Sequence, residues 1–177
     1  MLIRIMKYSL MSKITIKKIQ SWKNSKPFCA ITAYDFSTAK IIDGAGIPVV
    51  LVGDSASMVS YGYDTTIPIS MDEMLLVTRA VSRAIDSALV VGDMPFLSYQ
   101  TSTAMAVKNA GRFLKEGGVS AVKLEGGGVV AKHISKIVSF GIPVMGHVGL
   151  TPQSVNQFSG YAVQGKSVKS AQKILDD

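Results

Sequence analysis

Val49-Val-Leu-Val-Gly-Asp-Ser55 is a run of four apolar residues that leads into a glycine, an acid and a hydroxyl. Because three of the four are β-branched, the run predicts a buried strand that carries Asp54 and Ser55 at its C-terminal tip. The pattern returns in Ala88-Leu-Val-Val-Gly-Asp93 and, with a lysine in it, in Val119-Ser-Ala-Val-Lys-Leu-Glu125. The sequence therefore predicts three strands that each end in a carboxylate.

Helical segments lie between these strands and beyond them. Amphipathic spacing and capping residues predict helices within 13–24 and at about 35–43, 70–85, 101–116, 129–139 and 167–177. Further apolar runs at 28–33 and 144–148 predict one strand before the first acid and one after the third. Strand and helix thus alternate through five units, which is typical of a parallel sheet with right-handed crossovers.

A barrel and an open doubly wound sheet share this alternation. The chain has neither the glycine signature of dinucleotide-binding folds nor a phosphate loop that ends in Gly-Lys-Ser/Thr. A complete βα barrel needs about 250 residues and eight units, whereas this chain has 177 residues. We therefore expect an α/β fold, namely an incomplete (β/α)8 TIM barrel of about five to six βα units.

The composition fits a single globular domain, with 47% hydrophobic and 18% charged residues. We interpret residues 1–12 as an N-terminal extension and 13–177 as the partial TIM-barrel domain. No apolar run approaches the roughly 18 residues of a membrane helix, and the first ten residues are a poor signal peptide. The net charge of +7 lacks the clustering with aromatic residues that is typical of nucleic-acid sites. The single cysteine, Cys29, fits a reducing cytoplasm and a buried position in the first strand.

Strand periodicity predicts which side chains of 119–125 face the barrel interior. Ala121, Lys123 and Glu125 share one face, while Val122 and Leu124 share the other. Because the apolar face can pack against helices, we expect Lys123 and Glu125 to point into the barrel near its mouth. A lysine and a glutamate are costly to bury without partners, so the neighbouring strand ends must supply them.

Asp54, Asp93 and Glu125 are the candidate metal ligands. A single acid after a strand is more often a helix or turn cap, but its recurrence at three successive strand ends favours a shared site. Three nearby carboxylates repel one another, and a divalent cation such as Mg²⁺ removes that penalty. His147 ends the next strand at the same rim, as a candidate for contacting the substrate or supporting a metal ligand. A hydrogen-bonded core histidine remains an equal alternative.

Five segments, in this order, resemble the ketopantoate (3-methyl-2-oxobutanoate) hydroxymethyltransferase family from about residue 13 to the end. They are Ile31-Thr-Ala-Tyr-Asp35, Leu51-Val-Gly-Asp-Ser55, Gly92-Asp-Met-Pro-Phe96, Val122-Lys-Leu-Glu-Gly-Gly127 and Gly146-His-Val-Gly-Leu-Thr-Pro-Gln-Ser154. The resemblance implies a βα barrel, Mg²⁺, 5,10-methylenetetrahydrofolate as one-carbon donor and a cytoplasmic homodecamer. It also implies a metal site at Asp54, Asp93 and Glu125 and contacts to a 2-keto acid from Asp54, Ser55, Asp93 and Lys123.

The implied reaction adds a hydroxymethyl group to 3-methyl-2-oxobutanoate and gives 2-dehydropantoate in pantothenate biosynthesis. Mg²⁺ would stabilise the enolate formed by deprotonation at C3, while Lys123 and Ser55 hold the carboxylate or the developing charge. The general base of the family is a glutamate that no residue here matches. We therefore expect that base to lie beyond Asp177, and we expect the 177-residue chain alone to be inactive.

Two other functions stay open. The first is another Mg²⁺-dependent barrel enzyme for 2-keto acids, of the phosphoenolpyruvate mutase and isocitrate lyase type. The absence of a cysteine from the strand-end motifs disfavours its lyase version. The second is a non-catalytic remnant or assembly module, which would not bind a keto acid through Mg²⁺.

Overall fold

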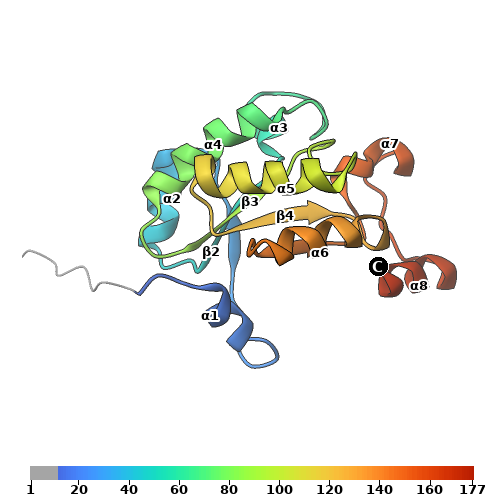
Figure 1. The fold of residues 1–177 in the computed structure, drawn as a ribbon, viewed down its shortest axis with the longest axis horizontal. Helices are drawn as coiled ribbons and strands as arrows, with labels where there is room; N and C mark the ends of the chain where they lie inside the picture. Colours follow the sequence, from blue (N-terminus) through green and yellow to red (C-terminus); the bar gives the residue numbers. More distant parts are fainter. Residues whose placement is uncertain (1–11) are drawn as a thin grey trace, which may run out of the picture.

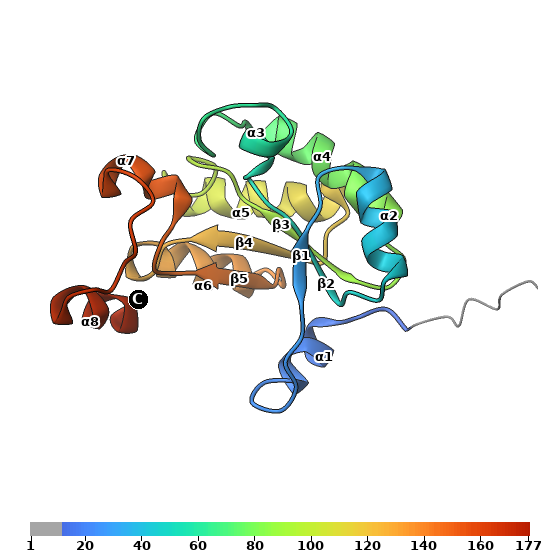
Figure 2. The same cartoon turned by 180° about the vertical axis from the view of Figure 1, so that it is seen from behind.

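The structure is a computed structural model, and it describes residues 12–177. Apart from residue 12, the expected N-terminal extension lies outside the described residues. The described part contains one parallel sheet whose strands follow one another in chain order. These strands are β1 (Ala30–Thr32), β2 (Val49–Val52), β3 (Leu89–Asp93), β4 (Ala121–Glu125) and β5 (Val144–His147). The expected α/β fold, an incomplete barrel of about five to six βα units, is confirmed, with a five-stranded sheet in the described part (Figures 1 and 2).

Helices connect the strands and cover the outer face of the sheet, with α2 packed on α4 and α5 packed on α6. Those that follow β1 to β3 are α2 (Phe36–Gly44), α3 (Ala56–Val59), α4 (Met71–Ala84), α5 (Thr103–Arg112) and the π-helix η1 (Phe113–Gly117). After β4 and β5 come η2 (Gly128–Val130), α6 (Ala131–Ser139), η3 (Pro152–Ser154), α7 (Val155–Phe158) and α8 (Val168–Asp176). None of the helices within 12–177 is long and apolar enough to cross a bilayer.

The expected caps fix where several helices begin. Asp35 accepts a hydrogen bond from the Thr38 N–H at 2.8 Å and begins α2. Ser70 and Glu73 form the reciprocal capping box that begins α4. These local signals are independent of the rest of the fold, which is why the sequence alone could identify them.

The two faces of the sheet bury different apolar clusters. On the outer face Val50, Val90, Val122 and Leu124 pack beneath the helices. On the inner face a second cluster packs against α1 (Ile16–Ser21), which Figure 2 shows below the sheet; its members are Val49, Leu89, Val91, Ala121, Ile14, Ile16, Ile19 and Leu51. The predicted alternation of β4 is confirmed, because Val122 and Leu124 face the helices and Ala121 faces inward.

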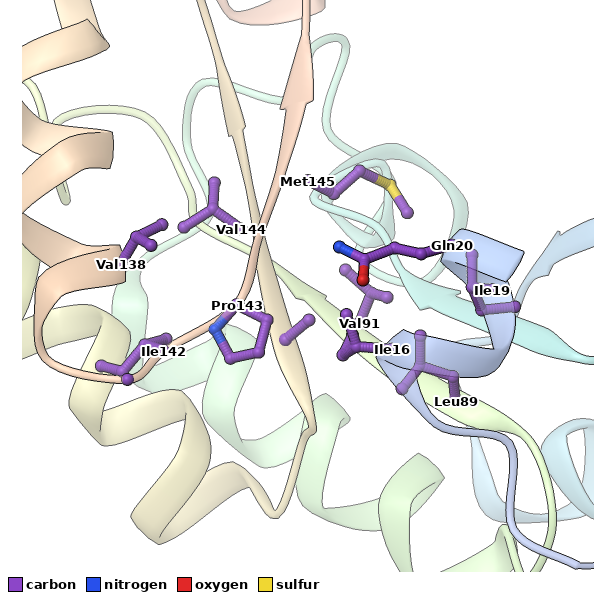
Figure 3. Close-up of a pocket in the computed structure, with 12 residues that line it drawn as sticks. Ile16, Ile19, Gln20, Leu89, Val91, Val138, Ile142, Pro143, Val144 and Met145 are labelled. Carbon is purple, nitrogen blue, oxygen red and sulfur yellow. The ribbon is translucent and has the colours of Figure 1, made fainter. Parts of the chain in front are cut away.

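An apolar cavity of about 520 Å³ lies between α1 and the inner face of β3 to β5 (Figure 3). It is lined by Ile16, Ile19, Gln20, Leu89, Val91, Ala121, Val138, Gly141, Ile142, Pro143, Val144 and Met145. None of the acids at the strand ends lines this cavity, so it is separate from the polar cluster described below.

Asp43, near the end of α2, joins that helix to the segment that enters β3. Its buried carboxylate accepts hydrogen bonds from the Asp86, Ser87 and Ala88 N–H groups, at 2.9, 3.1 and 2.9 Å, and from the Ser87 hydroxyl at 2.8 Å. Burial opposes ionisation, but these donors outweigh it and hold the pKa of Asp43 below its usual value. Asp43 therefore acts as a structural brace at the N-terminal side of the strands.

Three local expectations were wrong or incomplete. Cys29 is exposed and not buried, because it precedes β1, whose residues are all exposed at the edge of the described sheet. The Tyr-, Thr-, Gly- and Pro-containing stretch 57–70, whose composition predicts a long polar loop, begins inside the short helix α3. The helix expected over 101–116 changes at Phe113 into a π-helical turn that ends at Gly118, where φ is +76°.

Candidate active site

The C-terminal ends of β2 to β5 bring the predicted site residues to one rim of the sheet. Parallel pairing sets Asp93 beside Lys123 and Glu125 beside His147. Asp54 follows β2 by two residues and reaches the same rim. The side chains of Asp54, Asp93, Lys123 and Glu125 are all buried. The expected convergence is therefore present in the structure.

Lys123 neutralises part of this acidic cluster. Its Nζ donates to both carboxylate oxygens of Asp93, at 2.8 and 2.9 Å, and lies 3.5 Å from Glu125 Oε1. Burial alone would lower the pKa of Lys123, but the negative charges of Asp93 and Glu125 outweigh it and raise that pKa. Lys123 is therefore a protonated ammonium within the sheet interior.

The carboxylate of Asp54, unlike that of Asp93, has no direct contact with the Lys123 ammonium. The Asp54 backbone N–H donates to Asp93 Oδ2 at 3.2 Å, and Asp54 Oδ2 accepts from Gln153 Nε2 at 2.8 Å. Burial, reinforced by the charge of Asp93, raises the pKa of the Asp54 carboxyl to about 7. Burial likewise raises the pKa of Asp93, although the contact with Lys123 opposes that rise. These two acids therefore gain from any added positive charge.

Glu125 is held by three neighbours. Its Oε2 accepts from the Gln153 backbone N–H at 2.9 Å, while its Oε1 lies near Lys123 and 3.3 Å from His147 Nδ1. Burial would raise the pKa of Glu125, but His147 and Lys123 outweigh burial and lower it. The His147 contact lacks hydrogen-bond geometry, and Nδ1 has no hydrogen-bond partner within the described residues. His147 thus lies against a candidate metal ligand at the rim.

Ser55 lies at the start of α3, beside Asp54. Its Oγ is 2.8 Å from the Tyr34 hydroxyl, which approaches from the segment after β1. A Cβ added at Gly53 would lie only 2.8 Å from Ser55 Oγ, so the glycine lets the chain bring this hydroxyl close to the strand end. Ser55 is half-buried, and the structure places it at the same rim as the acids.

Gln153 and Tyr99 complete the cluster, and sequence reasoning assigned neither of them a role. Both are buried. The Tyr99 hydroxyl lies 2.7 Å from Gln153 Oε1 and 3.0 Å from both the backbone N and O of Glu125. Gln153 belongs to a segment that carries the family resemblance, which was the one available signal. Nothing in the pattern around Tyr99 distinguishes it from a core aromatic residue.

The donor chemistry of the cluster suits a hard divalent cation. Asp54, Asp93 and Glu125 offer only oxygen atoms, and within residues 12–177 the ammonium that contacts Asp93 and Glu125 is that of Lys123. Over residues 12–177, no three acidic, histidine or cysteine side chains form a group that could hold a metal ion as they stand. Asp54 and Asp93 are in direct contact, whereas Glu125 is turned towards Lys123 and Gln153. The three-acid metal site therefore stays a prediction.

Several solved structures of enzymes with other names have a similar fold. A phosphonopyruvate hydrolase matches with a TM-score of 0.62 and 16% identity over 85% of this chain and 55% of that one. A 2,3-dimethylmalate lyase of the PEP mutase/isocitrate lyase superfamily matches with a TM-score of 0.59 and 14% identity over 94% of this chain and 67% of that one. A phosphonopyruvate hydrolase in complex with oxalate and Mg²⁺ matches with a TM-score of 0.50 and 18% identity. This match covers 59% of this chain and 36% of that one. At these identities the likeness shows the fold.

Sequence relatives are much closer. A 3-methyl-2-oxobutanoate hydroxymethyltransferase from Carboxydothermus hydrogenoformans is 54% identical over 94% of this chain. One from Clostridium botulinum is 56% identical over 92% of it. The chain spans about 60% of the length of these relatives. The model of the ketopantoate hydroxymethyltransferase family matches residues 13–177, and the chain therefore belongs to that family.

Proposed function

We propose that this chain forms the Mg²⁺- and keto-acid-binding part of a ketopantoate hydroxymethyltransferase. The whole enzyme would transfer a hydroxymethyl group from 5,10-methylenetetrahydrofolate to 3-methyl-2-oxobutanoate and give 2-dehydropantoate. The observation that carries the proposal is the buried cluster of Asp54, Asp93, Lys123 and Glu125 at the strand ends, in a chain more than half identical to enzymes of that name.

Asp54, Asp93 and Glu125 would hold the metal ion in this proposal. When bound, Mg²⁺ supplies Lewis acidity that draws electrons from the keto carbonyl and makes the C3 proton more acidic. The raised pKa values of Asp54 and Asp93 support this assignment, because burial disfavours their ionised forms and a bound cation would favour them. The proposal is supported by a fold relative, a phosphonopyruvate hydrolase, whose solved structure is a complex with oxalate and Mg²⁺.

Lys123 and Ser55 would orient the keto acid. The buried ammonium of Lys123 can share its charge between Asp93 and a substrate carboxylate. The Ser55 hydroxyl, held by Tyr34, can donate to the same carboxylate or to the negative charge that develops on the substrate. The proton acceptor is assigned by resemblance to a glutamate outside these 177 residues. The chain would therefore bind the keto acid without converting it.

Calorimetric titration of the purified chain with 3-methyl-2-oxobutanoate tests this function. We expect binding that requires Mg²⁺, disappears in excess chelator, and is lost in Asp54→Ala and Asp93→Ala. Asp86→Ala is the matched control, since Asp86 is an exposed acid at the opposite end of β3. Circular dichroism verifies that each variant is folded.

The same titration separates the alternatives. Preferential binding of phosphonopyruvate or isocitrate would instead favour a mutase- or lyase-type enzyme, which the fold relatives alone support. If no keto acid binds and the variants behave like the wild-type chain, the chain is a non-catalytic module. The sequence identities of 54% and 56% favour the transferase over both.

The proposed assembly rests on the family resemblance, and the proposed localisation rests on that resemblance together with the single cysteine. On these grounds we propose a cytoplasmic homodecamer with small-molecule partners and no nucleic acid or membrane partner. Light scattering coupled to size-exclusion chromatography would measure the subunit number directly, and a value other than ten for the whole enzyme would overturn this part.

A further inference from the structure

Gln153 is a buried side chain with every hydrogen-bonding position occupied. It lies in η3, after β5, and only 6% of its surface is exposed. Its Nε2 donates to Asp54 Oδ2 at 2.8 Å and to the Met94 carbonyl at 2.9 Å. Its Oε1 accepts from the Tyr99 hydroxyl at 2.7 Å and from Gln100 Nε2 at 3.1 Å. An amide side chain can donate two hydrogen bonds and accept two, so these four bonds use all of its capacity.

This set of partners permits one orientation of the amide. Rotating it by half a turn would place its oxygen against the Asp54 carboxylate and the Met94 carbonyl. It would also place its NH₂ group against the NH₂ group of Gln100. Both arrangements oppose like partial charges in a buried site, where unpaired polar groups are costly. The donor end of Gln153 is therefore fixed on Asp54.

The backbone of Gln153 holds a second acid. Its N–H donates to Glu125 Oε2 at 2.9 Å. Gln153 thus occupies one oxygen of Asp54 and one oxygen of Glu125, on two strands that β3 separates. The other oxygen of Glu125 faces Lys123 and His147. No hydrogen bond is recorded to Asp54 Oδ1 from any residue of 12–177.

We propose that Gln153 is a positioning residue for cation binding, which selects the oxygens that Asp54 and Glu125 present to the metal ion. The inference rests on the proposed Mg²⁺ site, and it adds a residue that acts through the ligands without contacting the ion. Supporting partners of metal ligands typically contribute about 10- to 100-fold to metal affinity. The side chain of Gln153 holds Asp54 and its backbone N–H holds Glu125, so replacing the side chain releases Asp54 while Glu125 keeps its donor.

Titration of the 177-residue chain with Mn²⁺, followed by electron paramagnetic resonance, tests the proposal. Gln153→Met removes the amide at nearly constant length, and Gln153→Asn keeps the amide but shortens it by one methylene. Both variants retain the backbone N–H that holds Glu125. We expect each of them to bind Mn²⁺ at least about tenfold more weakly than the wild-type chain.

Gln172→Met is the matched control. Gln172 also donates to an aspartate, Asp176, at 2.8 Å, but on the exposed surface of α8. The Gln172→Met variant should bind Mn²⁺ with the affinity of the wild-type chain. A merely structural Gln153 would lower the melting temperature and leave the Mn²⁺ affinity of the folded variants within about twofold. That result would overturn the positioning role and leave the proposed function intact.

A second measurement needs no variant. In a Mg²⁺ titration of the wild-type chain followed by nuclear magnetic resonance, the side-chain amide signals of Gln153 should shift together with the Asp54 backbone signal. Those of Gln172 should stay in place. A shift at Asp54 without one at Gln153 would contradict the inference alone. Failure of the wild-type chain to bind either cation would overturn the proposed function together with the inference.

Discussion

Buried charges of both signs determine the character of the site at the scale of single residues. Asp54, Asp93 and Glu125 are more than nine-tenths buried, and Lys123 is the cation that reaches Asp93 and Glu125. Removing one partner of a buried ion pair is far more costly than removing an exposed one, since the remaining charge cannot return to water. Lys123 is therefore expected to contribute to stability as well as to substrate binding.

Lys123→Met should destabilise the chain strongly. It leaves two buried carboxylates without their ammonium, and the expected cost is about 3–5 kcal/mol of unfolding free energy. Urea denaturation followed by circular dichroism measures it. Asp86→Asn is the control, because it breaks the exposed Lys40–Asp86 ion pair and should cost less than about 1 kcal/mol. Equal losses in the two variants would contradict the internal ion pair.

Secondary-structure elements differ in how far the sequence determines them. The cap at Asp35, the capping box at Ser70 and the inward face of β4 follow from neighbours within a few positions, so local patterns predicted them. The Gln153–Asp54 hydrogen bond joins residues 99 positions apart, and no local pattern predicts such a contact. Cys29 is exposed because no further strand of the described sheet covers β1. The apolar pattern of residues 28–33 carries no information about such a neighbouring strand.

The glycine before Asp93 is an element-scale requirement. A Cβ at Gly92 would lie 2.5 Å from Phe113 Cδ1, so β3 and the π-helical turn can pack only without that carbon. Gly92→Ala should therefore cost about 1–3 kcal/mol, measured as a lower melting temperature. Gly92→Ala combined with Phe113→Leu should recover part of the loss.

Gly111→Ala provides the contrast for this prediction. Apart from its chain neighbours and the backbone of its own helix, no atom lies within 4 Å of a Cβ added at Gly111, which occupies α5. Since alanine favours helix over glycine, this variant should be as stable as the wild-type chain or gain up to about 1 kcal/mol. Destabilisation of both variants to the same degree would show that close packing at Phe113 is not the cause.

The brace at Asp43 predicts an acid-dependent stability. Its pKa is lower in the folded state than in the unfolded chain, so its ionised form stabilises the fold at pH values above about 4. The contribution is lost as the pH falls below that value and through the folded-state pKa. Asp43→Asn should cost about 1.5–3 kcal/mol at pH 7. Urea titrations at pH 7 and pH 3 should show this difference shrink, and a constant difference would contradict the prediction.

At the scale of the whole molecule, the structural contacts of Asp43 and the acidic cluster that we propose as the binding site lie at opposite ends of the strands. Asp43 and the α1 cluster hold the N-terminal side, while the acids, Lys123 and Gln153 occupy the C-terminal side. This division is typical of βα barrels, whose reactive groups lie beyond the carboxyl ends of the strands. The order of elements and the acidic rim could be predicted from the sequence. The hydrogen bonds of Asp43 and Gln153, which hold these elements and acids in place, could be identified only from the three-dimensional structure.

We expect the 177-residue chain to bind 3-methyl-2-oxobutanoate without converting it. In D₂O with Mg²⁺, 3-methyl-2-oxobutanoate should keep its C3 proton at the rate seen without protein, because the proposed proton acceptor is not among these residues. Proton nuclear magnetic resonance measures that exchange. Exchange or product formation at rates well above the protein-free control would show that one of the described residues can act as the base.

The ammonium of Lys123 also bears on how the chain would respond to metal depletion. Lys123 is part of the same strand as Glu125, and its ammonium lies beside Asp93 and Glu125. Part of the negative charge of these acids is therefore balanced by the protein itself and not by a bound ion. Small domains whose folding free energy comes from a bound metal unfold when a chelator removes that metal. Because Lys123 supplies this positive charge itself, we expect the chain to stay folded when a chelator removes the proposed metal ion.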